Sequence, residues 1–191
     1  MTPVQSLQLL DLPSILTSRW IGQLHERHRY YHTLGHIEHM LAHIPQGYET
    51  TELIAAIWLH DIVYNPHGAN NEALSAEQAQ MDLRRWSPES RQRVVQLILG
   101  TKYHMPAADE QNTLNDLDLL ILGEKPERYD AYAKHIRLEY AHVPINSYSK
   151  NRALFMRNFL ELGRIYMTPS FAPYEDQARE NIAREIEGLT A

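Results

Sequence analysis

The pair His60-Asp61 is the feature of this sequence best suited to chemistry, because it stands where an apolar helix should continue. The residues before it, Leu53 to Leu59, form an uninterrupted apolar run. Neighbouring helical residues point about 100° apart, so both side chains reach one object only if it lies against that edge of the helix. A divalent metal ion is such an object, since imidazoles and carboxylates are common ligands. The alternative is an N–H···carboxylate pair at a helix end, and two residues alone do not decide.

A leucine-rich segment downstream offers a further carboxylate ligand. Residues 113–123, TLNDLDLLILG, carry two acids. On a helical wheel Asp118 lies about 60° from the direction of the apolar residues, and Asp116 about 140° away. An unpaired carboxylate facing the core is costly, so an inward Asp118 indicates a ligand. We expect Asp116 to cap the start of its own helix.

Histidines upstream of the pair supply further candidates. The segment YYHTLGHIEHMLAHI contains His32, His36, His39 and His43. His36 shares a helical edge with Ile37 and Met40, which places it at the border of the core. His39 and His43 are one turn apart and could bind a metal at the surface, although a solvated helix face is the simpler interpretation.

The composition restricts the class of protein. A length of 191 residues suits one domain, and 43% hydrophobic with 22% charged residues is usual for a soluble globular protein. The absence of cysteine excludes thiol catalysis, and the net charge of −6 argues against binding a nucleic acid polymer. No apolar run approaches the roughly 20 residues of a membrane span, and the N-terminus lacks signal-peptide features, so we expect a cytoplasmic protein with no membrane contact.

Hydrophobic residues recur at three-to-four spacing along almost the whole chain, which predicts helices. The expected helices are 14–28, 37–44, 53–63, 72–86, 88–100, 113–123, 126–140, 149–166 and 174–188. Ser87 followed by Pro88 is a strong start signal for one of them. No segment has the alternation typical of a strand. The sequence therefore predicts an all-α, single-domain multi-helix bundle of about eight or nine helices.

These residues together resemble the HD superfamily of metal-dependent phosphohydrolases, in which a His, an adjacent His-Asp pair and a distant Asp bind a divalent metal in a helical bundle. The stretches RYYHTLGHI, AIWLHDIVYNP, NNEALSA, TKYH, DLDLLILG and IRLEYAHVP are similar to a bacterial branch described as predicted HD-type phosphohydrolases. The resemblance implies one HD-type domain over 1–191, with a core at about 27–167 and a C-terminal helical extension at 168–191. The implied metal ligands are His36, His60, Asp61 and Asp118, with Asp116 left open as the alternative to Asp118.

Two departures from known branches matter. The HHE and GYP signature of cyclic-di-GMP phosphodiesterases is absent. The nearest equivalent is His104, as an extra ligand of a binuclear site or as a contact to a ligand or to substrate. The segment after the last Asp reads Leu119 to Leu122, without the nucleotide-binding Asn of alarmone hydrolases, so alarmone hydrolysis is not expected.

The resemblance implies hydrolysis of a small phosphorylated metabolite, in particular a nucleotide, by metal-activated water. The metal would be Mn, Fe, Co, Zn, Ni or Mg. Asp61 would act both as ligand and as proton acceptor. Arg29, Lys102 and His104 are the expected phosphate contacts. Glu72 would orient water or a histidine ligand, or would simply favour the N-terminus of its helix.

Two other functions stay open. The first is a di-iron oxygenase of the HD type, which would need His104 together with His32 or Glu72 as further ligands. The second is a non-catalytic binding module in which a metal joins helices. The sequence leaves a homodimer open as well, because no surface stripe decides the oligomeric state.

Overall fold

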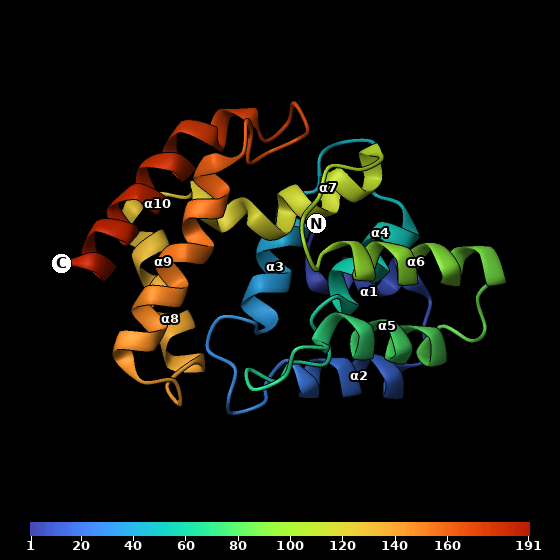
Figure 1. The fold of residues 1–191 in the computed structure, drawn as a ribbon. Coiled ribbons are helices and arrows are strands. Elements are labelled where there is room, and N and C mark those ends of the chain that lie inside the picture. Colours follow the sequence, from blue (N-terminus) through green and yellow to red (C-terminus); the bar gives the residue numbers. More distant parts are fainter.

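The computed structural model describes residues 1–191 and contains ten α-helices, two short 3-10 helices and no strand. The all-α prediction is confirmed, with slightly more helices than the eight or nine expected. The elements are α1 (Pro3–Leu10), α2 (Ser14–Gln23), α3 (Leu34–Ala42), α4 (Thr51–Leu59), α5 (Asn71–Asp82), α6 (Pro88–Gly100), α7 (Asp109–Leu119), η1 (Leu120–Gly123), α8 (Pro126–Glu139), α9 (Ile145–Glu161), η2 (Ala172–Tyr174) and α10 (Glu175–Thr190) (Figure 1).

Helix α1 is the element that the sequence patterns missed. Thr2 and Gln5 form a reciprocal capping box at its start, and Pro3 occupies the first turn. The helix has only eight residues and leaves Val4 and Leu9 exposed, so its periodicity is weak. Its buried Ser6 accepts a hydrogen bond from the indole N–H of Trp58, which attaches α1 to α4.

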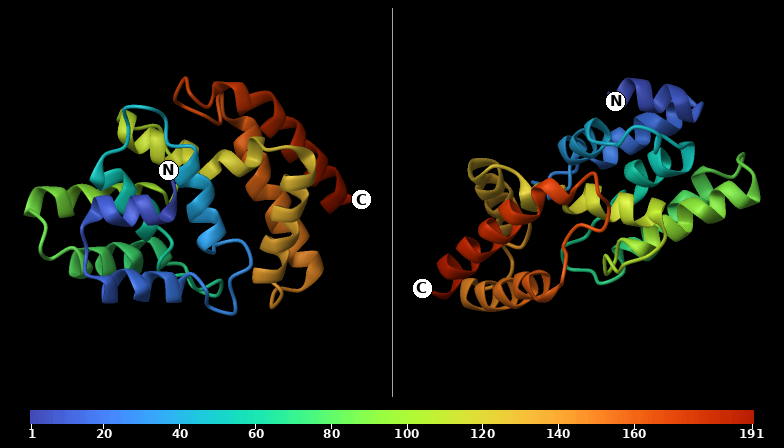
Figure 2. Two further views of the ribbon diagram at one scale, coloured as in Figure 1. Left: turned by 180° about the vertical axis from the view of Figure 1, so that it is seen from behind. Right: turned by 90° about the horizontal axis from the view of Figure 1, so that it is seen from above.

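The helices form two groups joined by α3 and α7. Helices α1, α2, α4, α5 and α6 lie on one side of the molecule, and α8, α9 and α10 on the other (Figures 1 and 2). Helix α4 is central to the first group, since every residue from Leu53 to Leu59 is fully buried. The apolar run that looked unusual in the sequence is therefore a helix surrounded on all sides.

Several helix ends differ from the predictions, and the turns explain why. The helix predicted at 53–63 ends at Leu59, because His60 is its C-cap and the chain then turns, with Ile62 N–H bonded to Leu59 C=O. The helix predicted at 14–28 ends at Gln23, and successive tight turns follow it. The helix predicted at 149–166 runs from Ile145 to Glu161.

The C-terminal segment packs into the same core as the rest of the chain. Ala178 and Ile182 of α10, with Phe171 before it, belong to one buried cluster that also includes α4. Helix α10 packs on α9 and η1, and a Cβ at Gly123 would come within 2.6 Å of Tyr174 Cβ, so the glycine permits this close approach. None of the helices is both long enough and apolar enough to cross a membrane.

Candidate metal centre

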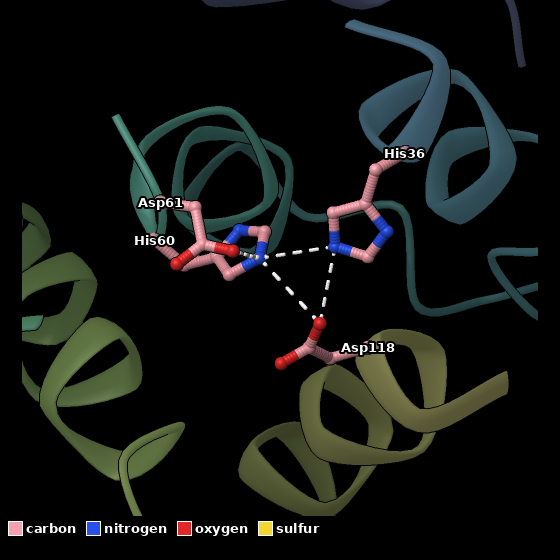
Figure 3. A group of neighbouring side chains, drawn as sticks. All are labelled: His36, His60, Asp61 and Asp118. Carbon is pink, nitrogen blue, oxygen red and sulfur yellow. Dashed lines mark hydrogen bonds and ion pairs between the residues drawn. The ribbon is translucent and has the colours of Figure 1, made fainter. Parts of the chain in front are cut away.

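The four predicted ligands converge on one point between α3, α4 and α7. His36 Nε2 lies 3.3 Å from His60 Nε2 and 3.1 Å from Asp118 Oδ1, and His60 Nε2 lies 3.1 Å from Asp61 Oδ2 (Figure 3). One ligand atom from each of the four residues falls within 4.8 Å of all the others. Residues far apart in the sequence therefore form a single cluster of two imidazoles and two carboxylates.

Each side chain is aimed by the local structure of its helix. His36 lies in the first turn of α3, whose start is capped by the hydroxyl of Thr33. His60 is the C-cap of α4, and its Nδ1 is 2.9 Å from the carbonyl of Ile57. A carbonyl only accepts, so His60 Nδ1 carries the proton and neutral His60 presents a bare Nε2 to the cluster. Asp61 follows at once, in the turn that ends the helix.

The donor set fits a divalent first-row ion. Ligand atoms about 2.0–2.2 Å from one ion lie about 3.0–3.5 Å from each other, and the contacts of 3.1–3.3 Å have this spacing. Imidazole nitrogen with carboxylate oxygen suits Zn, Fe, Mn, Co or Ni. The carbonyl bond on the far nitrogen of His60 is also the usual arrangement for a metal-binding histidine.

The close packing of the four side chains shifts the pKa values of the cluster. Burial opposes the charged forms, but His60 and its imidazole neighbours outweigh burial and hold the pKa of Asp118 well below its ordinary value. Conversely, Asp61 and Asp118 raise the pKa of His60 well above the usual value despite its burial. Burial lowers the pKa of His36. Burial also opposes the ionisation of Asp61, but His60 and His32 outweigh it and lower the pKa of Asp61. The two carboxylates are thus ionised, as metal ligands must be.

Glu139 is a buried residue of this region that the sequence reasoning missed. Its Oε1 accepts hydrogen bonds from the backbone N–H groups of Tyr30, Tyr31 and His32, at 2.8, 2.8 and 3.0 Å. Its Oε2 accepts from His32 Nδ1 at 2.7 Å and from the hydroxyl of Tyr64 at 2.8 Å. The opposite nitrogen of His32 lies 3.8 Å from Asp61 Oδ2. Glu139 therefore orders the loop before α3 and turns His32 toward the cluster.

A signal for Glu139 existed in the sequence. It shares a helical face of α8 with Tyr129, Tyr132 and Ile136, all buried. A carboxylate on an apolar helix face is costly unless it has partners, and this was the reasoning that favoured Asp118.

The side chain of Arg29, one of the predicted phosphate contacts, lies buried among backbone carbonyl groups. Its side chain is fully buried, and its Nη atoms donate to the carbonyls of His32, Asp61 and Ile62 at 3.1, 2.7 and 2.9 Å. Its Nε donates to Glu26. The guanidinium satisfies carbonyl groups where α4 ends, so it positions the turn that carries Asp61.

Asp116 is buried near the end of α7, which begins at Asp109, so it does not have its predicted role as a cap at the start of that helix. Its carboxylate accepts hydrogen bonds from Met167 N–H, Thr168 N–H and the Thr168 hydroxyl, at 2.9, 2.7 and 2.7 Å. Helix α7 lies between the two groups of helices and is covered on both sides. The helical wheel assumed that α7 has a single buried face. It therefore put Asp116 on the exposed side, which is wrong, while it put Asp118 on the side that faces the cluster.

The remaining predicted residues lie at different distances from the cluster. His104 joins it directly, with Nε2 at 2.9 Å from Asp118 Oδ2, on a backbone in the left-handed region with φ of 48°. Lys102 donates to the carbonyl of Ala69 and lies 3.8 Å from Glu72 Oε2. Glu72 stands in the first turn of α5, and no contact joins it to the four ligands.

Two buried polar atoms beside the cluster have no hydrogen-bond partner. They are His36 Nδ1 and the hydroxyl of Tyr31, whose rings have centroids 4.9 Å apart. Burial raises the pKa of Tyr31 well above its ordinary value, so the group is a neutral donor. Unpaired buried groups are uncommon and often mark a functional region.

Comparison with protein-family models, with curated proteins and with solved structures gave no match in any of the three.

Proposed function

We propose that this protein is a metal-dependent phosphohydrolase of the HD type that acts on a small phosphorylated metabolite such as a nucleotide. The observation that carries the proposal is the convergence of His36, His60, Asp61 and Asp118, with ligand-like spacing and ionised carboxylates. When bound there, a divalent ion would polarise a phosphoryl oxygen and acidify a coordinated water.

The exposure of the ligands indicates the side from which substrate arrives. The side chains of His36 and His60 are 1% exposed, whereas those of Asp61 and Asp118 are each 17% exposed. His32 and His104, at 20% and 19%, share this more open edge. We therefore assign the closed side to metal retention and the open edge, with Asp61 as proton acceptor, to water and substrate.

In this proposal His104 and Lys102 contact the phosphate, and Lys102 supplies positive charge. His104 already contacts a ligand carboxylate at the open edge. Lys102 stands two positions earlier in the same turn, and its side chain is partly exposed. With Arg29 engaged by carbonyl groups, these two are the remaining predicted phosphate contacts.

One observation favours a second candidate, a centre with two ions, as in the di-iron oxygenases of the HD type. His32 donates through Nδ1 to Glu139, so in the neutral ring Nε2 is bare, and it lies 3.8 Å from Asp61 Oδ2. A histidine held in this way by a carboxylate is a common metal ligand. No observation favours a non-catalytic module in which a metal only joins helices. The two carboxylates are partly exposed, which leaves room for water or substrate to exchange at the ion.

The test is metal content and phosphate release measured on the same preparations. The parent should bind a divalent ion at the centre and release phosphate from some member of a panel of phosphorylated metabolites, and Asp61→Ala should lose that ion together with the activity. A His32→Ala variant separates the centre with one ion from the centre with two. It should lower the metal content only if a second ion is held beside His32 and Asp61. A His60→Ala variant that kept both its metal and its activity would end the proposal.

A further inference from the structure

A second group of metal-ligating side chains lies on the same helix as His36, away from the candidate centre. His39 near the end of α3, His43 at its C-cap and Glu124 after η1 bring one ligand atom each to within 4.8 Å of one another. His39 Nε2 is 2.8 Å from Glu124 Oε1, and the rings of His39 and His43 have centroids 4.6 Å apart.

The orientation of His43 is that of a prepared ligand. Its Nδ1 is 2.8 Å from the carbonyl of His39, so Nδ1 carries the proton and Nε2 is bare in the neutral ring. Metal-binding histidines usually have such a bond on the far nitrogen. His39 is largely buried, and burial together with Arg128 lowers its pKa to about 4, which keeps it neutral near pH 7.

We propose that His39, His43 and Glu124 form a second metal site, selective for zinc-like ions such as Zn²⁺ or Co²⁺. Two imidazoles one helical turn apart plus one carboxylate are a donor set of known zinc sites, which leave a fourth position open. Mg²⁺ and Ca²⁺ prefer all-oxygen ligands and should bind poorly. The ion would join α3 to the turn between η1 and α8.

Arg128 places a positive charge beside this site. Its guanidinium, 50% exposed, lies 3.4 Å from Glu124 Oε1, the oxygen that also contacts His39. A bound cation would meet this positive charge at short range, so Arg128 should weaken the affinity and should move away when the ion binds.

The experiment counts ions in the full chain. Protein stripped with a chelator is loaded with Co²⁺, passed through gel filtration and analysed for metal. Glu124→Gln is the decisive variant, because the amide oxygen still accepts from His39 Nε2–H but lacks the charge of a metal ligand. We expect Glu124→Gln and His43→Ala each to bind one ion fewer than the parent. His142→Ala is the matched control, since His67 and His142 form an exposed stacked pair without a carboxylate ligand, and it should leave the count unchanged.

The outcomes separate this site from the candidate centre. Asp118→Ala should lose ions independently of Glu124→Gln, and the double variant should lose both sets. Equal counts in the parent, Glu124→Gln and His43→Ala would overturn the second site. A loss in Glu124→Gln with none in Asp118→Ala would keep the second site and overturn the candidate centre.

A second readout does not depend on losing a ligand. Arg128→Gln removes the competing charge and should tighten Zn²⁺ binding several-fold in competition with a chromophoric chelator. Unchanged or weaker binding would mean that the ion is not held beside Glu124, and the proposal would fail.

Discussion

Asp116 and Asp118 stand two positions apart on α7 and occupy opposite environments. Asp118 meets three imidazoles, and they hold its pKa well below the ordinary value despite burial. Asp116 meets backbone N–H groups and a hydroxyl, and burial raises its pKa. One carboxylate is thus surrounded by potential metal ligands, and the other closes the hydrogen bonds of a loop. The type of partner, rather than depth of burial, separates a candidate ligand from a structural acid.

The largest expected effect is a loss of metal affinity when Asp118 is changed. Asp118→Asn should weaken metal binding at the centre by about 100-fold or more, because a charged ligand is lost. Asp116→Asn is the matched control and should keep the metal that the centre binds. Elemental analysis and metal titration of both variants check this, and a loss of metal in Asp116→Asn alone would reverse the assignment.

The next effect belongs to Asp116. Asp116→Ala leaves Met167 N–H, Thr168 N–H and the Thr168 hydroxyl without their acceptor, so the free energy of unfolding should fall by about 4 kcal/mol. Urea denaturation of the metal-free protein measures it. A change below about 1 kcal/mol would show that water replaces the carboxylate in this loop.

Glu139 tests whether a second acid held by backbone N–H groups behaves as a structural residue. Burial opposes its ionisation, but His32, Tyr64 and the backbone outweigh it and lower the pKa from 4.5 to about 2. An acid with a depressed folded-state pKa contributes stability above pH 4.5 that is lost as the pH falls toward 2. This contribution reaches up to about 3 kcal/mol.

The measurement is unfolding of the parent and Glu139→Gln between pH 6 and pH 3. The parent should lose stability on acidification more steeply than the variant. Parallel curves would mean that Glu139 keeps an ordinary pKa.

The smallest expected effect on stability is that of the Thr168 hydroxyl, one of the three donors to Asp116. Thr168→Val removes one hydroxyl donor and keeps both N–H donors, so it should cost about 1 kcal/mol. Metal binding should be unchanged. A cost as large as that of Asp116→Ala would place most of the stabilisation in the hydroxyl.

Local patterns were sufficient for part of the fold and of the candidate centre. The apolar run of α4 and the Ser87-Pro88 start of α6 act within one helix, and both were predictable. His60 and Asp61 were found because they interrupt a local pattern. Helix α1 was missed because its eight residues carry little periodicity.

The roles of Arg29, Asp116 and Glu139 were not predictable in this way. Each depends on groups from another part of the chain: carbonyls at 61 and 62, N–H groups at 167 and 168, and N–H groups at 30–32. A one-dimensional pattern indicates that a polar group is buried, but not which distant backbone satisfies it.

The bonds of Glu139 also bear on the order of folding. Its bonds from the N–H groups of residues 30–32 join positions 107 to 109 residues apart, so they close a very long loop, and contacts of this kind form slowly. All four ligands of the candidate centre precede α8 in the chain, yet the loop that carries His32 is fixed only when α8 docks. During synthesis, a chain that ends before Glu139 would contain all four ligands but would lack the hydrogen bonds that fix the loop of His32. We expect the mature geometry of the centre to appear only when α8 has docked, after the helices themselves have formed.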